Sequence, residues 1–352
     1  MVEKTELKEK PAESRKKKHF KQFLTIVFII ANIAIILWTA SQEFSGKNSV
    51  KLSDVKIHWW FLIPALISFI VAIASECYKY GMLLKELAGK KDFKLSRQTV
   101  LLGRYYDNIT PAAIGGQPFQ ILHMKRGGVP GEYAAMVPII GFVTTQLAFV
   151  ALGILTIIFG ANIVLSPVTY AASYFGLVLY GSLPVMIVFF ALVPKTAKKL
   201  THSFMFFLHK IHIVKNIEKS EEKAFGEIEK YSKCIKKVLK DKKLFWKTMG
   251  LSFLYQFGMV SIPFFVISAF GGGISYLAAT MTAITIMAAV AFVPTPGNAG
   301  AAEGSFYLVF SALSSGYTFW AMLVWRFFSY YAFIALGGLT YLELSLDKKR
   351  KE

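Results

Sequence analysis

The sequence is poor in the residues and motifs that catalysis and metal binding require. It contains two cysteines, Cys77 and Cys234, and six histidines that are scattered mainly near the ends of apolar segments. Two cysteines cannot complete a metal site alone, and their separate settings argue against a disulfide. Nucleophile-elbow, zinc-protease and phosphate-loop motifs are absent from the sequence. We therefore expect no metal, no cofactor and no catalytic residue in this chain.

Acidic residues are also scarce, with 21 Asp and Glu against 40 Lys and Arg and a net charge of +19. In a soluble protein this balance would suggest a nucleic-acid partner, but no nucleic-acid-binding motif accompanies the charge. Most lysines instead flank long apolar runs, as the positive-inside rule predicts for cytoplasmic segments. With 55% hydrophobic residues and a mean hydropathy of +0.48, the chain is expected to be a multi-pass membrane protein.

Positive charges assign an expected topology to the apolar runs. The run 23–40 follows Lys16–Lys18 and is too long for the core of a signal peptide, so we expect it to remain as the first transmembrane helix. Later crossings are expected from Trp59 to about Lys79, and at 133–159, 168–193, 248–270 and 317–342. Basic residues place both termini in the cytoplasm, with tails at 1–22 and 347–352 around a transmembrane domain at 23–346 in the plasma membrane.

Two apolar stretches are interrupted by the same short pattern. Residues 110–117 read Thr-Pro-Ala-Ala-Ile-Gly-Gly-Gln, and residues 295–303 read Thr-Pro-Gly-Asn-Ala-Gly-Ala-Ala-Glu. Proline removes a backbone donor and glycine releases the helical geometry, so each pattern predicts an opened helix at membrane depth. Such an opening is tolerated only against protein or a water-filled cavity, and paired openings point to a transporter's substrate site.

The two interruptions predict opposed hairpins. The stretch 99–124 has basic residues at both ends and should enter and leave on the cytoplasmic side, whereas 274–314 should open outward. We therefore predict an all-α polytopic membrane protein with about seven spanning helices, two opposed broken or re-entrant hairpins and an inverted repeat. The predicted halves are 55–195 and 245–342.

A lysine-rich insertion at 195–247 separates these halves. Its apolar residues recur at helical spacing, which indicates amphipathic helices on the inner leaflet. A solvated cytoplasmic linker is the alternative. The apolar positions are Phe204, Phe206, Phe207, Ile228, Ile235, Val238 and Leu239.

Charged residues near the interruptions are the candidate substrate-binding groups. Charges at membrane depth are costly, so each is either functional or paired with another helix. Arg104 and Asp107 are three residues apart and could pair on one helical face, while Glu303 could cap its half-helix, neutralise Arg326 or bind a cation. Arginine suits a phosphate, and all four charges are predicted to share one cavity. Neutral polar groups complete the candidate site: Asn108, Gln117 and Asn298.

These segments carry a resemblance to a known family. Gly103–Pro111, Gly115–Pro118 and Pro294–Glu303 resemble the lysylphosphatidylglycerol synthase transmembrane-domain family, whose members are also described as flippase-like integral membrane proteins. The resemblance extends from about Phe20 to Leu346. Its most specific part is the block Pro-Thr-Pro-Gly-x-x-Gly-x-x-Glu, in which Asn298 stands where glycine is common.

The resemblance implies a role in lipid handling. In two-domain members the similar membrane domain moves aminoacylated phosphatidylglycerol, and a separate domain transfers lysine from lysyl-tRNA. Family naming therefore includes phosphatidylglycerol lysyltransferase and resistance to cationic antibiotic peptides. The chain ends at Glu352, so we expect no transferase chemistry from this chain alone. The expected function is translocation of a phospholipid such as lysylphosphatidylglycerol.

Three alternatives remain open. The chain could support lysylphosphatidylglycerol synthesis beside a separate aminoacyltransferase, or translocate a glycolipid or polyprenyl phosphate beside a glycosyltransferase. It could also act as a scaffold that recruits enzymes through the insertion at 195–247. Membrane phospholipid is the expected ligand, and no nucleic acid is expected as a partner.

Overall fold

The computed structural model describes residues 56–110, 115–159, 167–210, 216–291, 293–313 and 317–349. These residues are helical apart from short connections and contain no strand. Five helices among them are long and apolar enough to cross a membrane: Trp59–Ala88, Gly131–Phe159, Tyr170–Leu192, Lys242–Ala269 and Thr318–Asp347. The protein is therefore an all-α multi-pass membrane protein, as composition predicts. The first expected helix, at 23–40, lies outside the described residues.

The first half contains one long helix, a broken hairpin and two further long helices. Its elements are η2 (Trp59–Phe61), α2 (Leu62–Ala88), α3 (Phe93–Ile109), α4 (Gly116–Arg126), α5 (Gly131–Phe159) and α6 (Pro167–Leu192). The interrupted stretch at 99–124 is confirmed as α3 and α4, although Pro111–Ile114 lie outside the described residues. The end of α2 near Lys79 was wrongly predicted, because the helix continues to Ala88 and Lys79, like Glu76, faces the protein interior.

The second half repeats the long helix and the broken hairpin and ends in one further long helix. Its elements are α9 (Lys242–Ala269), α10 (Tyr276–Val290), η4 (Pro296–Asn298), α11 (Ala301–Leu313), α12 (Thr318–Arg326), η5 (Phe327–Tyr331) and α13 (Ala332–Lys349). The second predicted interruption is confirmed, with η4 between α10 and α11. The final helix contains a π-helical segment directly after Arg326, a feature that is frequent at functional sites.

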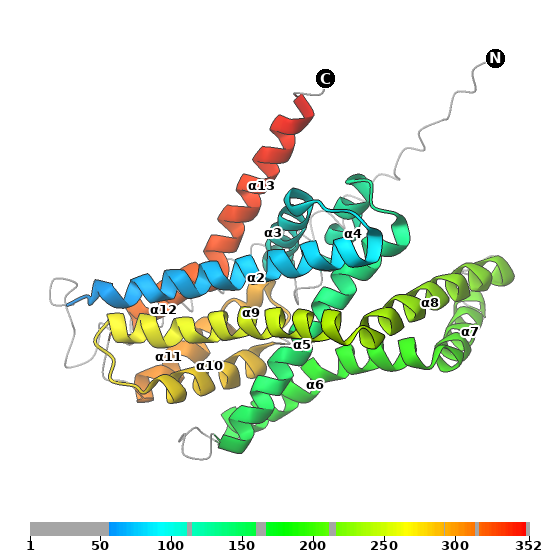
Figure 1. Cartoon of the computed structure of the whole chain (residues 1–352). Coiled ribbons are helices and arrows are strands. Elements are labelled where there is room, and N and C mark those ends of the chain that lie inside the picture. The colour runs from blue at the N-terminus through cyan, green and yellow to red at the C-terminus, as the bar shows by residue number, and fades with distance from the viewer. Residues whose placement is uncertain are drawn as a thin grey trace, which may run out of the picture.

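The packing supports the predicted inverted repeat. Contacts of α2 with α3 and α5, and of α4 with α3 and α5, recur as contacts of α9 with α10 and α12, and of α11 with α10 and α12. The equivalent helices α2 and α9 lie side by side and run in opposite directions (Figure 1). At one end the backbone N–H of His58 donates to the carbonyl of Ala269 at 2.8 Å. Since equivalent helices are antiparallel, the second half is inverted relative to the first.

The insertion forms two helices, α7 (Pro194–Lys210) and α8 (Ile217–Lys240). On α8 the predicted membrane-facing residues Ile235 and Val238 are buried against the bundle, and the Ser232 hydroxyl donates to the carbonyl of Ala191 at 2.5 Å. Helix packing therefore covers this part of the apolar face of α8 and leaves it unavailable to a membrane surface. On α7 Phe204, Phe206 and Phe207 are exposed, so the inner-leaflet prediction stays open there.

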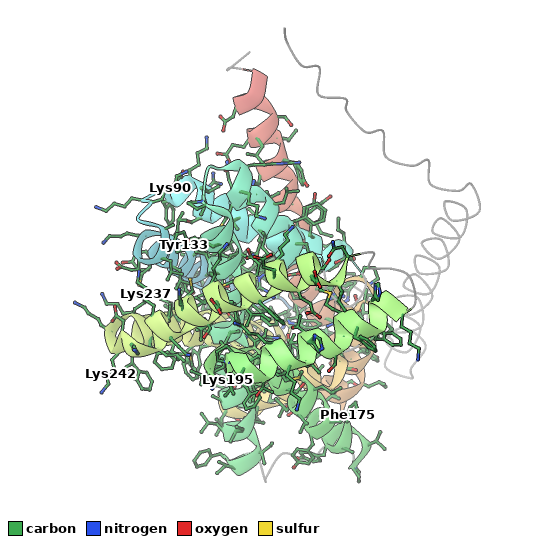
Figure 2. The ribbon with its side chains drawn as sticks, turned by 90° about the vertical axis from the view of Figure 1, so that its right-hand side faces the viewer. Lys90, Tyr133, Phe175, Lys195, Lys237 and Lys242 are labelled. Carbon is green, nitrogen blue, oxygen red and sulfur yellow. The ribbon has the colours of Figure 1, made fainter. Side chains whose placement is uncertain are left out.

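Lysines mark the polar end of the bundle near these helices. Figure 2, turned so that α7 and α8 face the viewer, labels Lys195, Lys237 and Lys242 around them. Lys198 donates a hydrogen bond to Glu229 and thereby ties α7 to α8. This contact holds the pKa of the exposed Glu229 carboxyl below its ordinary value.

Candidate functional site

The second break is a tight turn that requires glycine. Gly297 has φ 58° and Asn298 has φ 54°, so both adopt the left-handed conformation. A Cβ on Gly297 would collide with the ring of Tyr330 on η5. The Thr295 hydroxyl donates to the carbonyl of Ala299 at 2.9 Å and closes the turn. The sequence block therefore builds a compact, non-helical connection between α10 and α11.

A buried ion pair holds this turn in place. Glu303 on α11 accepts from Nε of Arg326 at 2.5 Å and from the backbone N–H of Gly300 at 2.6 Å. Arg326 on α12 also donates through Nη2 to the carbonyl of Gly297 at 2.9 Å. Glu303 and Arg326 are both buried, and together they satisfy backbone groups that the break leaves open. Among the predicted alternatives for Glu303, this geometry matches capping and neutralisation of arginine.

The first break is joined by hydrogen bonds across it. Asp107 on α3 accepts from the backbone N–H of Gly116 at 2.9 Å, and the Thr110 hydroxyl accepts from Gly115 N–H at 2.9 Å. A Cβ on Gly116 would collide with the Asp107 carboxylate. Asp107 therefore caps α4, and the ion pair of Arg104 forms with Glu76 rather than with Asp107 as predicted. The first turn of α4 has backbone N–H groups without helical partners. The Asp107 carboxylate accepts from one of them, at Gly116, and is therefore engaged there instead of with Arg104.

A second charge cluster lies on α2, where no functional residue was predicted. Lys79 is fully buried and lies 2.8 Å from the Glu76 carboxylate. Its ammonium also donates to the carbonyl of Gly141 at 3.1 Å, to the Thr145 hydroxyl at 2.5 Å and to the Ser252 hydroxyl at 3.0 Å. Helices α2, α5 and α9 thus supply a full set of acceptors for one ammonium group. Such a network compensates a charge that would otherwise be costly in the bundle.

Arg104 is the most available cation of the cluster. Its Nη2 lies 3.8 Å from Glu76, its guanidinium lies 4.7 Å from the ring centroid of Tyr255, and its side chain is 28% exposed. By comparison, Arg326 is buried and makes two close hydrogen bonds. Glu76 therefore holds Lys79 tightly and Arg104 loosely. The sequence signal that could have revealed this cluster is the presence of Glu76 and Lys79, three residues apart, inside one apolar run.

The two breaks lie side by side. The Asn108 amide donates to the carbonyl of Arg104 at 2.9 Å, and its Oδ1 would lie 3.1 Å from a Cβ on Gly297. Asn298 Oδ1 is buried and has no hydrogen-bond partner among the described residues. Gln117 is half-buried at the start of α4. The structure thus brings Asn108 and the 297–298 turn together.

A single cavity shared by Arg104, Asp107, Glu303 and Arg326 stays a prediction. Within the described ranges, the recorded ion pairs join Arg104 to Glu76 and Arg326 to Glu303, with no ion pair between the two sets. The described residues also contain no group of three or more His, Cys, Asp or Glu side chains that could hold a metal. What the arrangement offers chemically is a half-buried guanidinium and a buried amide acceptor beside two opened helices.

Two inverted halves with a broken hairpin in each define a polytopic helical membrane protein. The model of the lysylphosphatidylglycerol synthase TM region matches residues 22–337, and the chain belongs to this family. Two relatives are UPF0104 membrane proteins. One, from Pyrococcus horikoshii, is 21% identical over 80% of this chain and 84% of its own length. The other, from Methanothermobacter thermautotrophicus, is 23% identical over 94% of this chain and 98% of its own.

Proposed function

We propose that the protein translocates a phospholipid, such as lysylphosphatidylglycerol, between the leaflets of the plasma membrane. The observation that carries the proposal is the meeting of two opposed broken hairpins beside an incompletely paired, half-buried arginine. Broken helices expose backbone groups only where they line a protein cavity or an aqueous path. Both termini are proposed to be cytoplasmic, because the lysine-rich segments flank the same ends of the spans.

Arg104 is the proposed ligand of the lipid phosphate. Its 3.8 Å contact with Glu76 is longer than a close ion pair. A phosphate can therefore replace Glu76 as the partner of the guanidinium at a small cost in free energy. Lys79 stays 2.8 Å from Glu76 and continues to neutralise it when Arg104 turns to the lipid. Asn298 Oδ1, which lacks a partner among the described residues, suits an ammonium or hydroxyl donor of the head group.

A second candidate function is support of lipid synthesis. The family description names the membrane region of a synthase, which favours a separate aminoacyltransferase as a partner. A glycolipid or polyprenyl phosphate, with a glycosyltransferase as partner, would use the same arginine. A glycolipid or polyprenyl phosphate changes only the head group in the translocation test below, whereas support of synthesis without translocation predicts no lipid movement in it.

Reconstitution with defined lipids tests the proposal. Liposomes containing the purified chain would carry lysylphosphatidylglycerol, phosphatidylglycerol or a polyprenyl phosphate, each with the same fluorescent label, and label that reaches the outer leaflet would be counted with an impermeant quencher. We expect accelerated exposure of at least one of these lipids. Arg104→Gln should slow it by about 10- to 100-fold, the value of a charge-assisted hydrogen bond.

Arg97→Gln is the matched control on the same helix. Arg97 forms a 2.7 Å ion pair with Glu343 at the bundle surface, where such pairs contribute little. We expect this variant to retain the wild-type rate. Equal rates for wild-type liposomes and protein-free liposomes with all three lipids would refute translocation. A wild-type rate in Arg104→Gln would refute the assignment of the phosphate ligand.

A further inference from the structure

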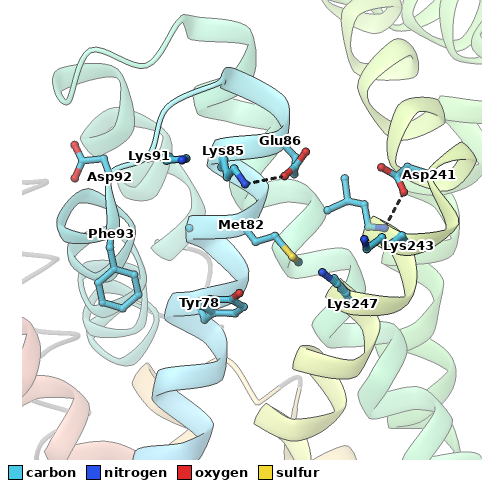
Figure 3. A pocket seen from close by; sticks show the side chains of 12 residues that line it. Tyr78, Met82, Lys85, Glu86, Lys91, Asp92, Phe93, Asp241, Lys243 and Lys247 are labelled. Carbon is cyan, nitrogen blue, oxygen red and sulfur yellow. Dashed lines mark hydrogen bonds and ion pairs between the residues drawn. The ribbon is translucent and has the colours of Figure 1, made fainter.

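A pocket opens at the polar end of the bundle, where the end of α2 meets the start of α9. It has a volume of about 610 Å³ and is lined by α2, the connection to α3 and the first turns of α9 (Figure 3). The lining faces away from the charge cluster described above. Tyr78, which lines the pocket, is exposed, whereas the adjacent Lys79 is buried on the inner side of α2.

The pocket collects more positive charge than its acidic residues neutralise. Its cationic side chains are Lys85, Lys91, Lys243 and Lys247, and its acidic side chains are Glu86, Asp92 and Asp241. The Glu86 carboxylate lies 3.7 Å from Lys85, which leaves this pair neutral. Within the described part of the chain, no ion pair is recorded for Lys91, Lys243 or Lys247. These three cations are the ones available to a ligand.

The other two carboxylates are already engaged in capping helices. Asp241 accepts from the backbone N–H of Leu244 at 2.9 Å and begins α9. Asp92 accepts from the backbone N–H of Leu95 at 2.8 Å and lies 3.5 Å from Lys90. Both carboxylates keep their charge, but the lining still holds four lysines against three acidic side chains, and neither carboxylate forms a recorded ion pair with Lys91, Lys243 or Lys247 among the described residues. The electrostatic preference of the pocket is therefore for an anion.

One wall of the pocket is apolar. Tyr78, Met82 and Phe93 line it, and Tyr78 and Phe93 leave 60% and 58% of their surface exposed. Trp246 lies beside Lys247 on α9 and is also exposed. Large exposed aromatic groups next to lysines are typical of the membrane–water boundary, where an amphiphile meets both surfaces. A soluble anion would use the lysines but leave the aromatic wall uncovered.

We propose that this pocket binds the head group of an anionic phospholipid, with the phosphate held by Lys243 and Lys247 on α9 and with Lys91 adding positive charge from the opposite wall. The acyl chains then cover the aromatic wall formed by Tyr78 and Phe93. Basic pockets between transmembrane helices at the cytoplasmic surface are suited to anionic head groups. This site is separate from the two breaks, so its occupancy does not depend on whether the protein translocates lipid.

The test measures lipid binding to the full-length protein in a neutral detergent. Dioctanoyl phosphatidylglycerol, dioctanoyl phosphatidylcholine and glycerol phosphate would be titrated separately, with Trp fluorescence and thermal stability as readouts. We expect phosphatidylglycerol to bind more tightly than the other two. Lys243→Gln with Lys247→Gln should weaken its binding about 25-fold, since each surface lysine contributes about fivefold.

Lys240→Gln with Lys242→Gln is the matched control. These lysines are exposed neighbours outside the pocket lining, so the control removes the same charge from the same surface. We expect it to retain wild-type affinity. Equal losses in both double variants would refute the pocket in favour of general surface charge. Glycerol phosphate binding as tightly as phosphatidylglycerol, or no preference for phosphatidylglycerol over phosphatidylcholine, would refute a lipid ligand.

Discussion

Removal of the Glu76 carboxylate should destabilise the protein strongly. In Glu76→Gln the ammonium of Lys79 loses its only recorded ionic partner while remaining fully buried. Breaking one side of a buried ion pair costs about 3–5 kcal/mol, since the remaining charge stays desolvated. The acceptors from Gly141, Thr145 and Ser252 remain, which favours the lower end of this range. We therefore expect a loss of about 3 kcal/mol.

Thermal unfolding in nanodiscs would measure this loss as a fall in Tm of about 6 °C, at roughly 2 °C per kcal/mol for a chain of this size. Glu86→Gln on the same helix is the control, because the Glu86 side chain is 43% exposed and its change should stay within about 0.5 kcal/mol. Lys79→Met combined with Glu76→Gln should recover part of the loss by removing the orphaned charge. Equal Tm values for Glu76→Gln and Glu86→Gln would refute the buried pair.

Three further predictions concern the second break and the topology. Gly297→Ala should lower Tm, because the left-handed turn disfavours a Cβ by about 1–2 kcal/mol and Tyr330 blocks it, whereas Gly304→Ala meets no atom within 4 Å and should be neutral. Glu303→Gln should destabilise the protein by about 3–5 kcal/mol, because it leaves the buried Arg326 without its carboxylate; slowed lipid movement at an unchanged Tm would instead give Glu303 a role in binding the lipid. Lys240→Cys, in a chain lacking its native cysteines, should react with an impermeant maleimide only after permeabilisation, and labelling of intact cells would contradict the cytoplasmic insertion.

Patterns governed by the backbone could be predicted from the sequence. Proline and glycine located both breaks, because their effect on a helix is local and does not depend on tertiary contacts. Lysine bias and the length of apolar runs located most helices, because the thickness of the membrane and the charge of its flanking segments are also read from local sequence. The repeat was detectable through a short motif, and the packing of α2 against α9 extends it to both halves.

Partners across helices could not be predicted, since they depend on which helix faces which. Spacing suggested a pair between Arg104 and Asp107, but the capping demand of α4 takes Asp107 and leaves Arg104 to Glu76 on α2. The sequence predicts a helix end near Lys79, because positive charge usually ends a transmembrane run. Its burial depends on three acceptors from α5 and α9, and only the folded bundle reveals them.

The backbone repeats, but the electrostatics of the two halves differ. In the second half Arg326 and Glu303 are joined at 2.5 Å and hold backbone groups of the break, so this arginine is committed to the turn. In the first half Glu76 is shared between Lys79 and a more distant Arg104, so this arginine can exchange partners. The sequence placed both arginines in one binding site, whereas the structure gives Arg326 to the turn and leaves Arg104 less tightly paired. Variants of Arg326 should therefore report on the integrity of the break, and variants of Arg104 on the binding of an anion.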